Sequence, residues 1–226
     1  MTRLLDLGIE RIHNIIMDMA KLSESSVFTA IESYENGSNV KNQIFEQSEK
    51  LRILQEEVAD LAIELIARYQ PVATDLRFIR SCMEIAYGFS RFGRYSYDIV
   101  DVLETMGSIS NCDKSAVLEM AKTVREMILL SVYSLQSRDK DAVRKLYQMD
   151  DTVDSLYRKY LREAIDSEKK ENGHNNNEYK AGKFSELRCY ISALLILRYL
   201  ERISDHACYI GDSVNYIVTG FSSPRR

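Results

Sequence analysis

Two pairs of carboxylates, each spaced four residues apart, are the features of this sequence best suited to chemistry. Glu201 and Asp205 form one pair, and Asp150 and Asp154 form the other. Residues four apart on an α-helix lie one turn above each other, so each pair would present both carboxylates on one face. The segment before the first pair, residues 193–197 (ALLIL), is strongly apolar. Charges directly after such a segment need a partner, because an unpaired charge beside a core is costly.

Two neighbouring antiparallel helices could bring all four carboxylates to one place. Like charges crowded together repel and raise each other's pKa unless a cation neutralises them. Oxygen ligands suit hard ions such as iron(III), manganese(II), magnesium or calcium, whereas zinc accepts carboxylates but prefers nitrogen and sulfur. His206 could add a nitrogen, although on a helix its side chain points about 100° away from that of Asp205. The alternative is ordinary surface salt bridges with Arg158, Arg162 and Arg202.

The elements that must position these pairs are six long helices. The chain has 226 residues with only 2 Pro and 9 Gly, and its apolar residues recur at spacings of three and four. The pattern predicts helices over about 3–35, 39–69, 74–106, a segment ending near 137, 140–167, and a segment from 179–185 to 219. The expected breaks include the turn at 70–71, the linker 107–113 and a polar loop at 171–177. No strand-like alternation competes, so we predict an all-α fold.

Six helices with short connections are most simply arranged as two tandem three-helix bundles. We expect a first bundle at 1–108, a second at 109–220 and a tail at 221–226. An internal repeat supports this division. With an offset of 111, the third predicted helix overlays the sixth, so that Leu76-Arg77 falls on Leu187-Arg188. An offset of 102 overlays the second helix on the fifth.

The composition limits the class of protein. The net charge is −4 without a strongly basic face, so nucleic acid is not expected as a partner. No apolar run approaches the roughly 20 residues of a membrane span, and the N-terminus has no signal-peptide core. We therefore expect a soluble, cytoplasmic protein. Its four cysteines, Cys82, Cys112, Cys189 and Cys208, are scattered without a CxxC motif, and we expect reduced and mostly buried thiols.

Three stretches resemble motifs of the PhoU family of phosphate-uptake regulators. Residues 70–77 (QPVATDLR) resemble the family's QPxAxDLR turn, and residues 200–207 (LERISDHA) resemble its LERIGDxA motif. Residues 150–154 (DDTVD) resemble its DxxxD motif. The likeness covers nearly the whole chain, including the layout of six helices.

The resemblance implies a metal site in the second bundle. In that family each bundle carries an E/DxxxD pair on each of two helices, and these pairs bind metal, often as multinuclear iron or zinc clusters. Here the implied ion is iron or zinc, with manganese or magnesium as alternatives. The implied ligands are Asp150, Asp154, Glu201 and Asp205.

The first bundle departs from this pattern. At the positions of the four carboxylates, the repeat places Ser48, Arg52, Ser90 and Arg94. Because two of these residues are cations, we predict no metal site on the first bundle. The four could instead attract an anion, although exposed arginines on a helix are usually just solvated.

The function implied by the resemblance is that of a regulatory adaptor. Such proteins restrain a phosphate ABC transporter and its sensor kinase when phosphate is plentiful, so the implied partners are the transporter ATPase and a sensor histidine kinase. The membrane would be reached only through these partners, and we also expect a homodimer. No P-loop, GxSxG or HExxH motif is present, which favours a protein that is not an enzyme.

Two other functions stay open. One is a carboxylate-bridged metal enzyme in a helical bundle, although such sites usually use Glu-x-x-His pairs and none lies near His206. The other is a metal-free helical scaffold that binds another protein through its first bundle.

Overall fold

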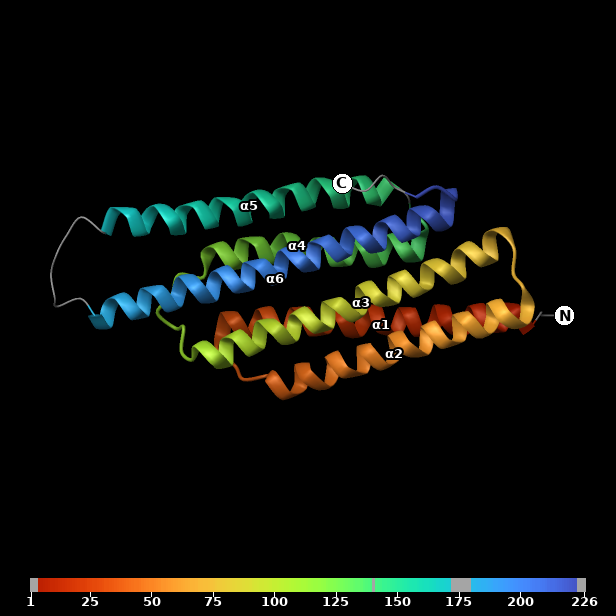
Figure 1. Ribbon diagram of the computed structural model, residues 1–226, viewed down its shortest axis with the longest axis horizontal. Coiled ribbons are helices and arrows are strands. Elements are labelled where there is room, and N and C mark those ends of the chain that lie inside the picture. Colours follow the sequence, from red (N-terminus) through yellow and green to blue (C-terminus); the bar gives the residue numbers. More distant parts are fainter. Residues whose placement is uncertain (1–3, 140, 172–179, 223–226) are drawn as a thin grey trace.

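The computed structural model describes residues 4–139, 141–171 and 180–222 of the chain. These residues form six α-helices and no strand (Figure 1). The helices are α1 (Leu4–Asn36), α2 (Lys41–Tyr69), α3 (Ala73–Met106), α4 (Ser115–Ser137), α5 (Asp141–Glu171) and α6 (Lys180–Thr219). The predicted all-α fold is confirmed, with helix ends close to those expected. From residue 172 onward, the predicted loop at 171–177 lies outside the described residues.

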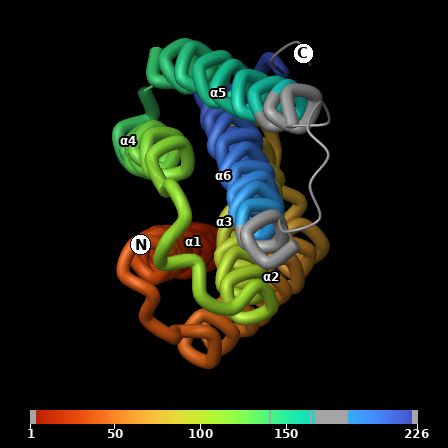
Figure 2. Tube along the Cα trace, turned by 90° about the vertical axis from the view of Figure 1, so that its left-hand side faces the viewer, coloured from red at the N-terminus to blue at the C-terminus, as the bar shows by residue number. Residues whose placement is uncertain are grey.

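The six helices run side by side along the long axis of the molecule (Figure 1). Seen end on, α1 and α2 lie at one side, α4 and α5 lie at the other, and α3 and α6 lie between them (Figure 2). α3 packs on α1, α2 and α6, while α6 packs on α3, α4 and α5. The two predicted three-helix bundles are confirmed and are joined through α3 and α6. Their bounds at 1–108 and 109–220 stay a prediction.

The apolar residues of the helices form one continuous core. Positions that the predicted repeat equates are buried alike: Ile85 and Ile196 are at most 1% exposed, and Ile99 and Ile210 are fully buried. Burying one such side chain stabilises the fold by roughly 1.5–3 kcal/mol. The repeated positions of α3 and α6 are therefore buried in the same register. None of the helices in the described ranges is long and apolar enough to cross a membrane.

The turn between α2 and α3 shows how the local sequence sets the helix ends. Gln70 adopts a left-handed conformation (φ 45°), and its N–H donates to the Ile66 carbonyl oxygen at 3.1 Å. Pro71 follows and has no N–H with which to continue the helix. α3 begins at Ala73, with Asp75 in its first turn, where the helix dipole favours a negative charge. The chain then runs back along α2 (Figure 1).

Two glycines on α3 let its neighbours approach closely. A methyl group at Gly88 would lie 2.7 Å from Ile210 Cγ1 of α6, and one at Gly93 would lie 2.5 Å from Leu51 Cδ1 of α2. Both distances are well inside the normal contact distance of two carbon atoms. α3 is therefore held tightly between α2 on one side and α6 on the other.

The prediction that all four cysteines are reduced is wrong for two of them. Cys112 and Cys189 form a disulfide, with their Cα atoms 5.4 Å apart. The fold brings the α3–α4 linker beside α6, and a separation of 77 residues in the sequence gives no sign of that proximity. Cys82 and Cys208 are free and buried, as predicted.

Gly93→Ala should lower the free energy of unfolding by about 1–3 kcal/mol, because the added methyl group overpacks the α2–α3 contact. The better helix propensity of alanine, about 1 kcal/mol, offsets part of that cost. Urea unfolding measures the change. Leu51→Ala removes the atoms that clash, so the same glycine substitution should cost much less in that background. An equal cost in both backgrounds would contradict the close approach as its cause.

Candidate metal centre between helices α5 and α6

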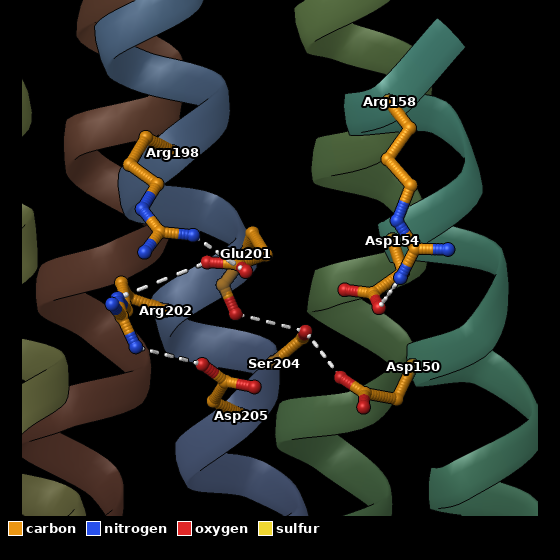
Figure 3. Close-up of polar contacts among 8 residues, drawn as sticks. All are labelled: Asp150, Asp154, Arg158, Arg198, Glu201, Arg202, Ser204 and Asp205. Carbon is orange, nitrogen blue, oxygen red and sulfur yellow. Dashed lines mark hydrogen bonds and ion pairs between the residues drawn. The ribbon is translucent and has the colours of Figure 1, made fainter.

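All four predicted metal ligands lie where α5 and α6 pass each other (Figure 3). Asp150 and Asp154 stand one turn apart on α5, while Glu201 and Asp205 stand one turn apart on α6. Apolar packing fixes the two helices beneath them, through fully buried Val153, Leu200 and Ile203. The structure therefore brings both carboxylate pairs to one face of the molecule.

The α5 pair is held by one contact to α6 and one within its own helix. The Ser204 hydroxyl lies 2.7 Å from Asp150 Oδ1 and 3.0 Å from the Glu201 carbonyl oxygen. The shorter contact is the charge-assisted one, so Ser204 donates to the carboxylate and links α6 to α5. Asp154 forms an ion pair with Arg158, one turn further along α5.

The α6 pair is bound by arginines of its own helix. Arg198 Nη1 lies 2.7 Å from Glu201 Oε1, and Arg202 Nη1 lies 3.3 Å from Asp205 Oδ2. Arg202 Nε is also 3.9 Å from Glu201 Oε2. Among the expected salt-bridge partners, Arg158 and Arg202 therefore do pair with these carboxylates.

The carboxylates at this face repel one another. The pKa values of Asp150, Glu201 and Asp205 are all raised, in each case first by burial. The charge of Asp205 raises the pKa of both Asp150 and Glu201, and the charge of Asp154 raises the pKa of all three. The arginines and the Ser204 hydroxyl oppose this effect without cancelling it. The site thus disfavours its own negative charge, first through burial and then through the crowding of carboxylates.

The donor chemistry fits a hard multivalent cation, because every candidate ligand is a carboxylate oxygen. Glu201 Oε2 fits as well, since it is buried and accepts no hydrogen bond. Within the described ranges, however, no three Asp, Glu, His or Cys side chains are placed to hold one ion as they stand. Three of the carboxylates instead form ion pairs with arginines of their own helices. The four-ligand set stays a prediction, and filling it requires those ion pairs to open.

His206 points away from the carboxylates and packs against α3. Its ring centroid is 5.6 Å from that of Tyr87, 5.8 Å from that of Tyr95 and 6.1 Å from that of Tyr209. Burial, followed by the positive charges of Arg91 and Arg202, lowers its pKa to about 4. The imidazole is therefore neutral near pH 7 and part of the α3–α6 aromatic contact.

Sequence reasoning did not single out Arg198 or Ser204. Arg198 lies three residues before Glu201, which is a helix ion-pair spacing and a usable signal. Ser204 has no comparable signal, because its contact with Asp150 depends on where the two helices cross.

The corresponding crossing of α2 and α3 keeps the packing and lacks the carboxylates. In the repeat, Gly93 takes the place of Ser204, and Ser48 takes the place of Asp150. A methyl group at Gly93 would lie 3.3 Å from Ser48 Cα, so the two helices meet at the same position. Ser90, which is half-buried, takes the place of Glu201.

The two arginines of the first bundle are paired with acids of their own helices. Arg52 lies 3.1 Å from Glu49 and 2.7 Å from Glu56, and Arg94 lies 3.1 Å from Asp98. Because these partners already neutralise the arginines, the arrangement favours solvated ion pairs over a patch for anions.

The family profile of the PhoU domain matches two stretches of the chain, residues 16–103 and 117–214. The second match is shifted by 101 residues at its start (117 against 16) and by 111 at its end (214 against 103). The predicted internal repeat, with offsets of 102 and 111, is therefore confirmed.

Curated relatives match the chain along almost its whole length. The phosphate-specific transport system accessory protein PhoU homolog of Clostridium acetobutylicum is 26% identical over 224 residues, which is 97% of each chain. The corresponding homolog 1 of Thermotoga maritima is 25% identical over 213 residues, covering 91% of this chain and 84% of the relative.

Two solved structures share the fold. PhoU from Pseudomonas aeruginosa superposes with a TM-score of 0.83 at 23% identity, covering 96% of this chain and 99% of that one. The phosphate transport system regulatory protein PhoU from Streptococcus pneumoniae gives a TM-score of 0.83 at 17% identity, covering 98% and 100%.

With a metal chelator present, Glu201→Gln should raise the thermal midpoint at pH 7 by about 1–3 °C. Burial and the charge of Asp205 raise the folded-state pKa of Glu201 above 4.5. Its ionisation therefore costs stability as the pH rises from the unfolded-state pKa through the folded-state pKa, and glutamine removes that cost. Scanning calorimetry at pH 7 and at about pH 4 measures the effect.

The gain should fade toward the lower pH, where the wild-type side chain becomes protonated in both states. Exposed Glu119 on α4 offers a matched control, since Glu119→Gln changes the net charge equally without relieving this crowding. A midpoint below that of the control at pH 7 would contradict repulsion at the site.

Proposed function

This chain belongs to the PhoU family, and from that membership we propose that it is a regulatory adaptor of phosphate uptake rather than an enzyme. It restrains a phosphate ABC transporter and the associated sensor kinase when phosphate is plentiful. Its partners are the transporter ATPase and the sensor histidine kinase, which it reaches from the cytoplasm as a homodimer. The observation that carries this proposal is the match along both halves, including relatives named as accessory proteins of phosphate transport.

The proposal includes a metal ion bound in the second bundle. Asp150, Asp154, Glu201 and Asp205 would hold it, as iron or zinc, or else as manganese or magnesium. When bound, the ion supplies the positive charge that this carboxylate cluster lacks. Four carboxylates face three paired arginines here, which leaves one negative charge in excess.

The chain's own residues have separate roles at that site. Ser204 orients Asp150 toward α6, while Arg158, Arg198 and Arg202 neutralise part of the negative charge when no ion is present. Ion pairs of this partly exposed kind contribute about 0–1 kcal/mol each, so opening them is a small cost against a multivalent ion. The metal is then structural or regulatory. The first bundle, with Arg52 and Arg94 at the equivalent positions, would bind none.

Metal analysis of the purified protein tests the ligand set. Asp154→Ala and Asp205→Ala should each reduce the bound metal at least tenfold, because each removes a charged ligand from a small set. Asp151→Ala is the matched control on the same helix and should keep the wild-type metal content. Metal retained by both ligand variants would contradict the site.

The adaptor role calls for a test in cells and one in solution. Deleting the gene should leave phosphate uptake and kinase output high in phosphate-rich medium, and the wild-type gene should restore their restraint. The purified chain should bind the purified transporter ATPase or the kinase, and light scattering should give twice the chain mass. Unchanged uptake after deletion, together with no binding to either protein, would contradict the adaptor role.

A further inference from the structure

The Cys112–Cys189 disulfide joins the linker between the two bundles to the beginning of α6. We propose that it is a redox-controlled clamp, closed by oxidation and opened by reduction, that holds the first turns of α6 at the junction of the two halves. The proposal is independent of the metal site and of the partners considered above. It rests on what surrounds each cysteine.

The linker side of the clamp is anchored to the first bundle. Lys114 Nζ donates to the Glu35 carbonyl oxygen at 2.9 Å and lies 5.6 Å from the ring centroid of Tyr34, both at the end of α1. Ile109 is buried, and its carbonyl oxygen accepts the Cys112 N–H at 3.1 Å. The linker therefore gives Cys112 a fixed position.

The same linker reaches the second bundle. The disulfide places Cys112 of the linker beside Cys189 of α6, with their Cα atoms 5.4 Å apart. The cross-link therefore ties the beginning of α6 to a linker that is anchored at the end of α1.

Around Cys189, the described side chains of α6 are only partly packed. Leu187 is 53% exposed, Tyr190 41% and Ile191 38%, whereas Ile196 and Leu197 further along the helix are buried. The first turns of α6 and the last turns of α5 also extend past the linker (Figure 1). Because these three described side chains bury only part of their apolar surface, the disulfide adds to what fixes this part of α6.

The position of the two sulfurs suits reversible chemistry. Cys112 and Cys189 are only half-buried, which leaves this pair more open to a thiolate from solution than the buried Cys82 and Cys208. Cys82 and Cys208 are buried, and burial raises the pKa of the Cys82 thiol to about 12, which suppresses its thiolate. Of the four cysteines, only Cys112 and Cys189 are therefore placed to form and break a disulfide as redox conditions change.

The chemistry of the clamp balances with small-molecule thiols. To open it, a glutathione thiolate attacks one sulfur, forms a mixed disulfide and releases the other cysteine as a thiolate, and a second glutathione thiolate then attacks the mixed disulfide and releases the first cysteine. The products are two protein thiols and the oxidised reductant. To close it, the two thiols give two electrons and two protons to a low-molecular-weight disulfide, which becomes two thiols.

Opening acts on the end of α6 rather than directly on the carboxylates. Glu201 is twelve residues beyond Cys189 on the same helix, a distance of about 18 Å. We therefore expect local loosening of residues 186–191 and of the linker 107–114, with the α3–α6 contact intact.

Full-length protein in oxidised and reduced glutathione buffers tests the clamp. Alkylation followed by mass spectrometry should find the Cys112–Cys189 peptide linked in the oxidised buffer and both thiols alkylated in the reduced one. Hydrogen exchange of the linker 107–114 and of residues 186–191 should become at least about tenfold faster on reduction. Exchange of 85–99 in α3 should not change.

Two variants serve as controls. Cys82→Ser keeps the disulfide and should respond to the buffers as the wild type does. Cys112→Ser should exchange like reduced wild type in both buffers, and if it fails to fold, the two buffers still compare the wild type with itself. Four alkylated thiols in the oxidised buffer would overturn the proposal. So would a linked pair whose reduction leaves the exchange of both segments unchanged.

Discussion

The packing of α3 against α6 is the contact on which the rest of the structure depends. Each of these helices is the inner member of its own bundle, and together they join the two halves. Gly88 allows α6 to approach α3 closely, and the rings of Tyr87 and Tyr95 on α3 pack against the ring of His206 on α6. Because both helices are fixed in this way, their outward faces, which carry the candidate site and its first-bundle counterpart, are fixed too.

The candidate site is a balance between two ways of neutralising the same carboxylates. In the protein alone, arginines on α5 and α6 supply the positive charge, and three carboxylates still have raised pKa values. A multivalent ion would supply more charge at one point, at the small cost of opening partly exposed ion pairs. The first bundle has the same helix crossing but places Arg52 and Arg94 there, which removes the need for an ion.

The helices could be predicted from the sequence because their signals are local. Apolar spacing of three and four residues, the Gln70-Pro71 turn and the linker after Met106 specify where each helix lies. The carboxylate pairs were visible because four-residue spacing means one face on any helix. The role of Ser204 and the Cys112–Cys189 disulfide were not visible, since both depend on how separate helices meet. Cysteine spacing alone pointed to reduced thiols, and tertiary proximity overrides that signal.

The central claim is that the two halves share a fold but differ in metal chemistry, with one metal-competent face on the second bundle. Anomalous X-ray diffraction from crystals soaked with iron or zinc tests this claim most directly. The account predicts anomalous density between Asp150, Asp154, Glu201 and Asp205 and none beside Ser48 and Ser90. Density on the first bundle, or none between α5 and α6 in crystals that take up the metal, would contradict it.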